Sequence, residues 1–61
     1  MKQPQPNEKS PFTRYREGYV DGYHAREIRM SEDNDYLRGY KEGNEDDIEG
    51  VPNRFPEDPL G

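Results

Sequence analysis

Cysteine and tryptophan are absent from this chain of 61 residues, and apolar residues make up only 26% of it. Without cysteine, neither a disulfide nor a thiolate metal site can strengthen the fold. No apolar run reaches the roughly 18 residues that a membrane span needs. The first residues also lack the apolar centre of a secretory signal. We therefore expect a soluble, cytoplasmic protein with a small core and no membrane contact.

The whole chain has a net charge of -5, and its negative charge is concentrated in one part. Residues 1–31 carry six Lys/Arg and four Asp/Glu, whereas residues 32–49 carry two and eight. Nucleic-acid binding depends on Lys and Arg, so the acidic part is expected to meet a basic surface on a partner protein. The carboxylates expected to form this acidic face are Glu42, Glu45, Asp46, Asp47 and Glu49.

One motif occurs twice. The pattern Tyr-x-x-Gly-Tyr-x-x-Gly begins at Tyr15 and again, 21 residues later, at Tyr36. On a helix, residues four apart share a face, and glycine inside a helix costs about 0.8–1 kcal/mol against alanine. A repeated cost of this kind indicates a contact that needs close backbone approach, which predicts an all-α, two-helix hairpin. The residues predicted to pack the helices together are Tyr15, Gly18, Tyr19, Gly22, Tyr36, Gly39, Tyr40 and Gly43.

The first helix has a clear start signal. Ser10 is suited to the N-cap and Pro11 to the first helical position. Aromatic residues recur after it at spacings of three and four, which predicts a helix over residues 12–25. Val20 falls outside this stripe, so it is expected to be exposed or to touch a partner.

The second helix is expected after a connection at residues 26–31, in which Ile28 or Met30 closes the open end of the hairpin. Ser31 is predicted to cap this helix at its start. Gly43 and Asn44 are predicted to end it, and continuation to Ile48 is the less favoured alternative.

Prolines set apart the two ends of the chain. The sequence predicts a flexible arm at residues 1–9, the helical hairpin at 10–49 and an extended proline-rich tail at 50–61. Val51, Phe55 and Leu60 are isolated apolar residues in the tail. They either attach loosely to the hairpin or dock on another molecule.

The sequence offers no catalytic set. His24 is the only histidine, and it is three residues from Asp21 and Glu27, a spacing that more often gives a surface ion pair than a catalytic group. The acidic run lacks the ligand pattern of an EF-hand loop. We expect no enzyme activity, no cofactor and no metal.

The two motifs resemble the ribosome modulation factor family and its small phage and prophage relatives. That family has Gly-Tyr-x-x-Gly and a small residue three positions on, matched here by residues 18–22 and Ala25. Its second helix has Trp-x-x-Gly-Trp-x-x-small, matched by residues 36–43 with tyrosine for both tryptophans. The resemblance covers about residues 14–44 and implies a two-helix fold in a bacterial or phage setting. It also implies ribosome binding, in a family whose named member is strongly basic, unlike this chain.

Three functions follow as hypotheses. The leading one is a small acidic protein that docks on a basic host macromolecule, such as a nucleic-acid-binding protein, and modulates or inhibits it. The second is a ribosome-associated factor that binds through the first helix. The third is a self-associating structural component, for which a homodimer would add stability to a core worth only about 3–5 kcal/mol.

Overall fold

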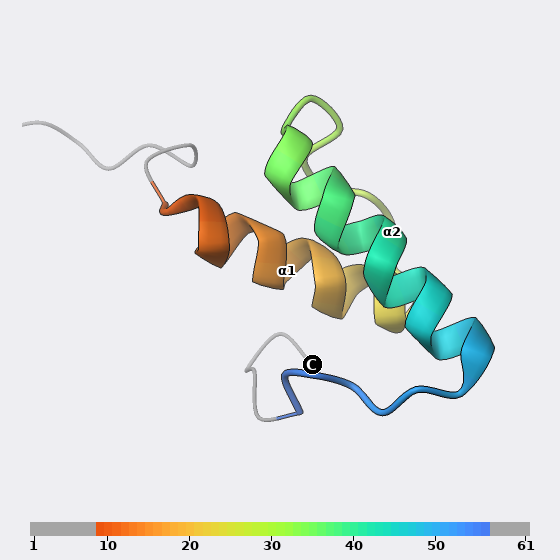
Figure 1. The fold of residues 1–61 in the computed structure, drawn as a ribbon. Coiled ribbons are helices and arrows are strands. Elements are labelled where there is room, and N and C mark those ends of the chain that lie inside the picture. Colours follow the sequence, from red (N-terminus) through yellow and green to blue (C-terminus); the bar gives the residue numbers. More distant parts are fainter. Residues whose placement is uncertain (1–8, 57–61) are drawn as a thin grey trace, which may run out of the picture.

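The computed structural model describes residues 9–56, and these form two helices without a strand (Figure 1). Helix α1 covers Pro11–Tyr23 and helix α2 covers Asn34–Glu49. The predicted all-α, two-helix hairpin is therefore confirmed. The expectations for residues 1–8 and for residues 57–61 of the tail, Leu60 included, lie outside the described residues.

Helix α1 begins as predicted and ends earlier. The Ser10 hydroxyl accepts a hydrogen bond from the Thr13 N–H at 3.1 Å, and Pro11 is the first helical residue. At the other end Ala25 has a φ of 57°, in the left-handed region. The Ala25 N–H bonds the Gly22 carbonyl and the Arg26 N–H bonds the Asp21 carbonyl, which is the Schellman arrangement. The helix thus ends at Tyr23, and the prediction of residue 25 was wrong.

The predicted start of α2 was also wrong, because Asp33 is the N-cap in place of Ser31. The Asp33 carboxylate accepts the Tyr36 N–H at 3.0 Å and also binds Arg14 of α1 at 3.1 Å. Either residue type is a good N-cap. The ion pair with α1 accounts for the choice of Asp33, since Ser31 carries no charge to offer that arginine.

Helix α2 continues through Gly43 and ends at Gly50, so the predicted stop at Gly43 and Asn44 was wrong. Gly50 has a φ of 76°, and the Val51 N–H bonds the Asp46 carbonyl at 2.8 Å. A Cβ on Gly50 would meet nothing within 4 Å, whereas one on Gly43 would lie 2.0 Å from the Tyr19 carbonyl oxygen. Gly43 is a packing glycine, and Gly50 is the one that ends the helix.

The two helices cross at their four glycines. A Cβ on Gly18 would lie 1.9 Å from the Tyr36 oxygen, and one on Gly39 would lie 2.0 Å from the Tyr15 oxygen. Gly22 and Gly43 face the carbonyls of Tyr40 and Tyr19 in the same way. Each pair maps onto the other by the 21-residue repeat. The contacts advance together along both helices, so the helices run in the same general direction. Residues 24–33 carry the chain from the end of α1 back to the start of α2 (Figure 1).

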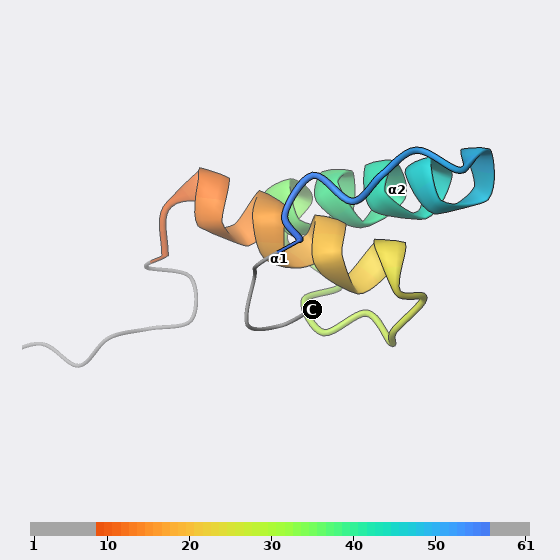
Figure 2. The ribbon, with the colours of Figure 1, turned by 90° about the horizontal axis from the view of Figure 1, so that it is seen from below.

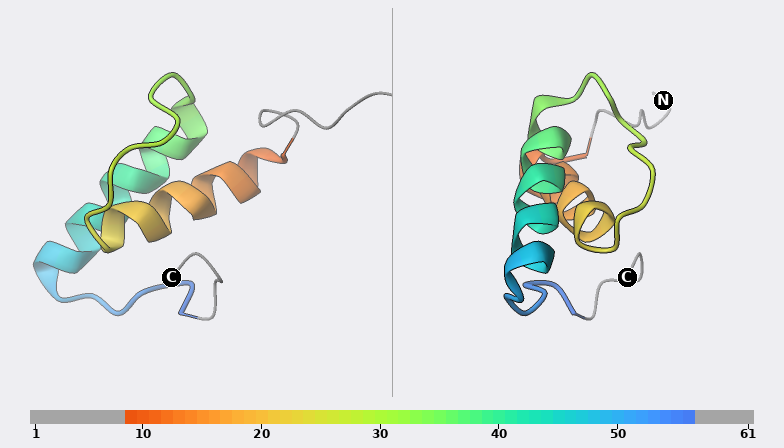
Figure 3. Two further views of the ribbon diagram at one scale, coloured as in Figure 1. Left: turned by 180° about the vertical axis from the view of Figure 1, so that it is seen from behind. Right: turned by 90° about the vertical axis from the view of Figure 1, so that its right-hand side faces the viewer.

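Residues 24–33 also explain the burial of Val20, which is fully buried within this chain, whereas the sequence predicted that it is exposed or touches a partner. Helix α1 lies between α2 on one side and this connection on the other (Figure 3). All residues from Glu17 to Gly22 are buried as a result. Of the two residues expected to close the hairpin, Ile28 remains 48% exposed and Met30 is half-buried.

The tail returns along the helices. After Gly50 the chain turns back and runs beside α1 and α2 as far as the described residues extend (Figure 2). The Tyr23 hydroxyl donates to the Val51 carbonyl at 2.7 Å. The Phe55 ring lies 5.3 Å from the Tyr19 ring and 5.9 Å from the Phe12 ring, centroid to centroid, both edge-on. Of the two alternatives for the tail, attachment to the hairpin describes Val51 and Phe55.

Candidate functional site

Two tyrosine–carboxylate pairs hold the helices together at equivalent positions. The Tyr15 hydroxyl of α1 donates to Glu42 of α2 at 2.5 Å, and the Tyr36 hydroxyl of α2 donates to Asp21 of α1 at 2.6 Å. Adding 21 to Tyr15 gives Tyr36, and subtracting 21 from Glu42 gives Asp21. The repeat therefore extends from the glycine contacts to the polar groups beside them.

The inner site is built around Asp21, whose exposed fraction is 2%. Its carboxylate accepts the Tyr36 hydroxyl and the Arg29 Nε at 2.8 Å, and Arg26 lies 3.5 Å away. The Arg29 N–H donates to the Tyr36 hydroxyl at 3.0 Å. Burial, and then the bond to Asp21, raise the pKa of Tyr36. A buried carboxylate held by this many donors is a structural site.

The outer site is the counterpart of this cluster around Glu42 and Asp46. The Tyr19 hydroxyl donates to Asp46 at 2.5 Å. Burial, and then the bond to Asp46, raise the pKa of Tyr19 to about 12. Burial, and then the bond to Glu42, also raise the pKa of Tyr15. The Glu42 side chain is 36% exposed, so the outer site is open to solvent where the inner one is closed.

Arg54 of the tail occupies the outer site. Its Nη1 donates to the Tyr15 hydroxyl at 2.7 Å and lies 3.4 Å from Glu42, while its Nε lies 3.3 Å from Asp46. The guanidinium also lies over the Tyr19 ring, 5.0 Å from the centroid, at the distance of a cation–π contact.

The roles of Arg54 and of the pairing between Phe55 and Tyr19 were not predicted from the sequence. The structure shows an equivalence that the residues alone do not: Arg54 follows the left-handed Gly50 by four residues, just as Arg29 follows the left-handed Ala25 by four. Each arginine binds a tyrosine–carboxylate pair that joins the helices. The segments that follow the two helices are therefore structural counterparts.

The predicted acidic face divides into two parts. Glu42 and Asp46 turn toward the tyrosine hydroxyls and Arg54. Glu45, Asp47 and Glu49 are exposed, with Glu45 3.5 Å from Lys41 on the solvent side. At 100° per residue, Glu42, Glu45, Asp46 and Glu49 fall within an arc of about 100°. Asp47 lies on the same face as Gly43, beyond the end of α1.

All eight predicted packing residues lie at the interface or its edge. The four glycines, Tyr19 and Tyr36 are buried, and Tyr15 and Tyr40 are half-buried. The Tyr40 hydroxyl donates to the Arg26 carbonyl. Each of the five tyrosine hydroxyls thus donates a hydrogen bond to another part of the chain.

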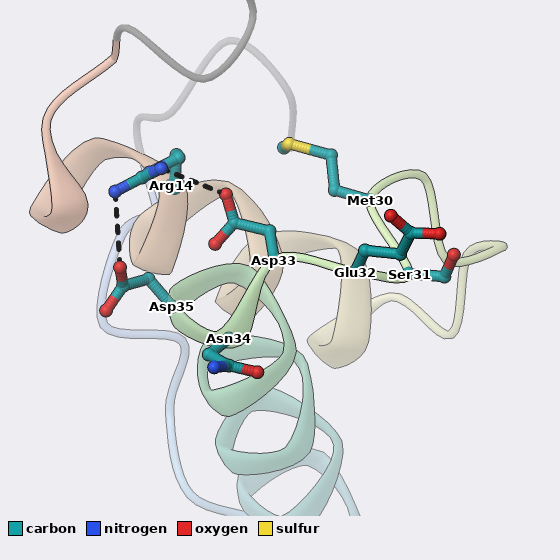
Figure 4. A pocket seen from close by; sticks show the side chains of 7 residues that line it. All are labelled: Arg14, Met30, Ser31, Glu32, Asp33, Asn34 and Asp35. Atoms are coloured by element: carbon teal, nitrogen blue, oxygen red, sulfur yellow. Dashed lines mark hydrogen bonds and ion pairs between the residues drawn. The ribbon is translucent and has the colours of Figure 1, made fainter.

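A shallow hollow lies where the connection meets the start of α2, and Arg14 lines it (Figure 4). The Arg14 guanidinium binds Asp33 at 3.1 Å and Asp35 at 3.2 Å (Figure 4). Two carboxylates neutralise this arginine, whose side chain is largely buried. The ion pairs that line the hollow therefore join α1 to the start of α2.

Within residues 9–56, no cluster of three or more His, Cys, Asp or Glu side chains is arranged to hold a metal ion. Neither described helix is long and apolar enough to cross a membrane. His24 is the exposed C-cap of α1, and its ring lies edge-on to Tyr23.

Comparison of the chain with protein families, with curated proteins and with solved structures finds no match.

Proposed function

We propose that this chain is a small, non-enzymatic binding protein whose acidic α2 docks on a basic surface of a host macromolecule and modulates or inhibits it. The supporting observation is the division of labour along α2. Its first half packs on α1 through Tyr36 and Gly39, whereas its last turns carry Glu45, Asp47 and Glu49 into solvent. The fold does not use these three carboxylates for packing.

A basic protein surface is the partner that suits this charge. Exposed carboxylates on one helix steer a partner of opposite charge and suppress partners of like charge. A nucleic-acid-binding protein carries such a surface, and α2 would compete there with phosphate. The arginines of α1 suit phosphate less well, since Arg14 already binds two carboxylates. For this reason we rank ribosome binding through α1 second.

Charge reversal tests the proposal. The variant E45K/E49K changes two exposed carboxylates of α2, and E27K/E32K makes the same charge change at exposed positions of the connection. Tagged chains are used to capture partners from a bacterial lysate, with and without nuclease. We expect basic proteins to be captured by the wild type and by E27K/E32K, to survive nuclease, and to be lost with E45K/E49K.

Two outcomes would contradict the proposal. Equal capture by both variants would show that the acidic end of α2 is not the docking surface. Loss of the captured proteins on nuclease treatment would favour the ribosomal alternative.

A further inference from the structure

We propose that the outer site is a recognition site for an arginine followed by an aromatic residue in a partner protein, and that Arg54 and Phe55 are its resident, displaceable occupants. The inference rests on the proposed function, because it names the part of the basic partner that α2 receives. The site is formed by Tyr15 and Tyr19 of α1 with Glu42 and Asp46 of α2.

The contacts of the outer site distinguish arginine from a simple positive charge. Two different nitrogens of Arg54 engage Glu42, Asp46 and the Tyr15 hydroxyl, and the flat guanidinium covers the Tyr19 ring. A lysine ammonium has no such planar fork and cannot reach these groups in the same geometry. The chemistry selected is therefore a guanidinium.

The neighbouring contact selects an aromatic ring. Phe55 lies edge-on to three rings of α1, with centroid distances of 5.3 Å to Tyr19, 5.9 Å to Phe12 and 6.5 Å to Tyr15. Edge-on aromatic pairs at these distances are favourable beyond simple burial. Phe12 is still 58% exposed with Phe55 in place, so this aromatic surface extends past its present occupant.

Comparison with the inner site indicates that the outer occupant can leave. Residues 26–29 reach Asp21 from a connection that is fixed at both ends by helices. Residues 51–55 follow Gly50, and in the described part of the chain, which ends at Pro56, no second helix anchors their other end. The two arginines are equally exposed, at 48% for Arg54 and 47% for Arg29, and the difference lies in the carboxylates. Glu42 is 36% exposed and Asp46 14%, against 2% for Asp21. Ion pairs this exposed contribute little stability. A similar segment of a partner makes equivalent contacts, so the tail is favoured over it only by its tethering.

Displacement of the tail would also free Glu42 and Asp46 of the acidic surface for a partner. Arg54 neutralises the inner edge of the stripe formed by Glu42, Glu45, Asp46 and Glu49. A partner arginine in its place would leave Glu45 and Glu49 beside it to meet further basic residues. The tail thus acts as an intramolecular competitor that only a partner of matching chemistry overcomes.

A labelled peptide with the sequence of residues 51–56, Val-Pro-Asn-Arg-Phe-Pro, is the probe. In the full chain, R54A/F55A vacates the site, and circular dichroism checks its helices. We expect saturable binding by fluorescence anisotropy, at least tenfold tighter than to the wild type, whose tethered tail competes at an effective concentration of order mM. Adding E42Q/D46N to the vacated chain should weaken binding at least tenfold. A peptide with alanine for both Arg and Phe is the control.

A second measurement does not depend on the folding of R54A/F55A. In the wild-type chain, excess peptide should move the NMR signals of the Phe55 ring toward those of an unpacked phenylalanine. No saturable binding to a folded R54A/F55A chain, or binding unaffected by E42Q/D46N, would overturn the proposal. If R54A/F55A does not fold, unchanged Phe55 signals at mM peptide would overturn it.

Sedimentation separates the other occupant, the tail of a second copy. A wild-type dimer that R54A/F55A converts to monomer would replace the partner segment with a second copy and overturn the proposal. Failure here is also distinct from failure of the proposed function. Peptide binding reports on Glu42 and Asp46, whereas capture from lysate reports on Glu45 and Glu49.

Discussion

The carbonyl oxygen of Tyr36 lies 1.9 Å from the position that a Cβ on Gly18 would take. The hydrogen that Gly18 carries there points at this oxygen, which is the arrangement of a Cα–H···O contact between helices, worth about 0.5–1 kcal/mol. Three further glycines face carbonyls in the same way. Small residues four apart are a known means of bringing two helix backbones close together.

We expect Gly18→Ala and Gly39→Ala each to lower the free energy of unfolding by more than about 3 kcal/mol. Backbone atoms of the other helix occupy the space, so no side chain can move aside to accommodate the added methyl group. That loss approaches the whole stability of a core this small. Thermal melts followed by circular dichroism measure it. Asn44→Ala, at an exposed position of α2, should change stability by less than about 0.5 kcal/mol. Melting curves for the glycine variants that match the wild type would show that the helices do not approach this closely.

Ala25 and Gly50 form a matched pair at the ends of the two helices. Ala25 adopts a left-handed φ of 57°, which costs an L-residue about 1–2 kcal/mol. Glycine avoids this cost, but it loses part of the gain because the unfolded chain has more conformational freedom with glycine. We expect Ala25→Gly to stabilise by about 0.5–1 kcal/mol and Gly50→Ala to destabilise by a similar amount. Urea denaturation of both variants gives the two signs. A loss of stability in Ala25→Gly would contradict the Schellman ending of α1.

The inner and outer sites predict unequal costs for equivalent substitutions. Asp21→Asn replaces the buried carboxylate that binds Arg29 and Tyr36 by a neutral amide. Breaking such a buried ion pair lowers the free energy of unfolding by about 3–5 kcal/mol. Glu42→Gln, at the half-exposed equivalent position, should cost less than about 1 kcal/mol. Urea midpoints of the two variants test the difference. Equal costs would mean that the outer site is as closed as the inner one.

Alkaline pH should unfold the protein through its tyrosines. A folded pKa of about 12 for Tyr19, above its ordinary value of 10.0, means that folding favours the neutral hydroxyl. The resulting stability is fully present below pH 10 and is lost as the pH rises toward 12. Tyr15 and Tyr36 shift in the same direction. We expect tyrosinate absorbance and helix loss to change together over this range.

Tyr19→Phe is the control for the alkaline transition. It removes the titrating hydroxyl and keeps the ring that packs on Phe55, so part of the loss of stability above pH 10 should disappear. Ordinary titration of all five tyrosines near pH 10 with the helices intact would contradict the role assigned to their hydroxyls.

The sequence by itself determined the two helices, the start of α1 and the close contact between the repeated motifs. These features are local or repeated: Ser10 and Pro11 act on the turn that they precede, and a glycine inside a helical aromatic pattern indicates close approach wherever it lies. The acidic character of α2 is likewise a matter of composition.

Only the tertiary structure decided which local signal applies where two compete. Ser31 and Asp33 are both good N-caps, and the ion pair of Asp33 with Arg14 selects one of them. Gly43 and Gly50 are both possible helix ends, and the Tyr19 carbonyl against Gly43 assigns it to packing. The burial of Val20 depends on the connection at residues 24–33, and the position of Arg54 depends on the tail that returns along the helices. Such contacts join residues far apart in sequence, so no local pattern of residues specifies them.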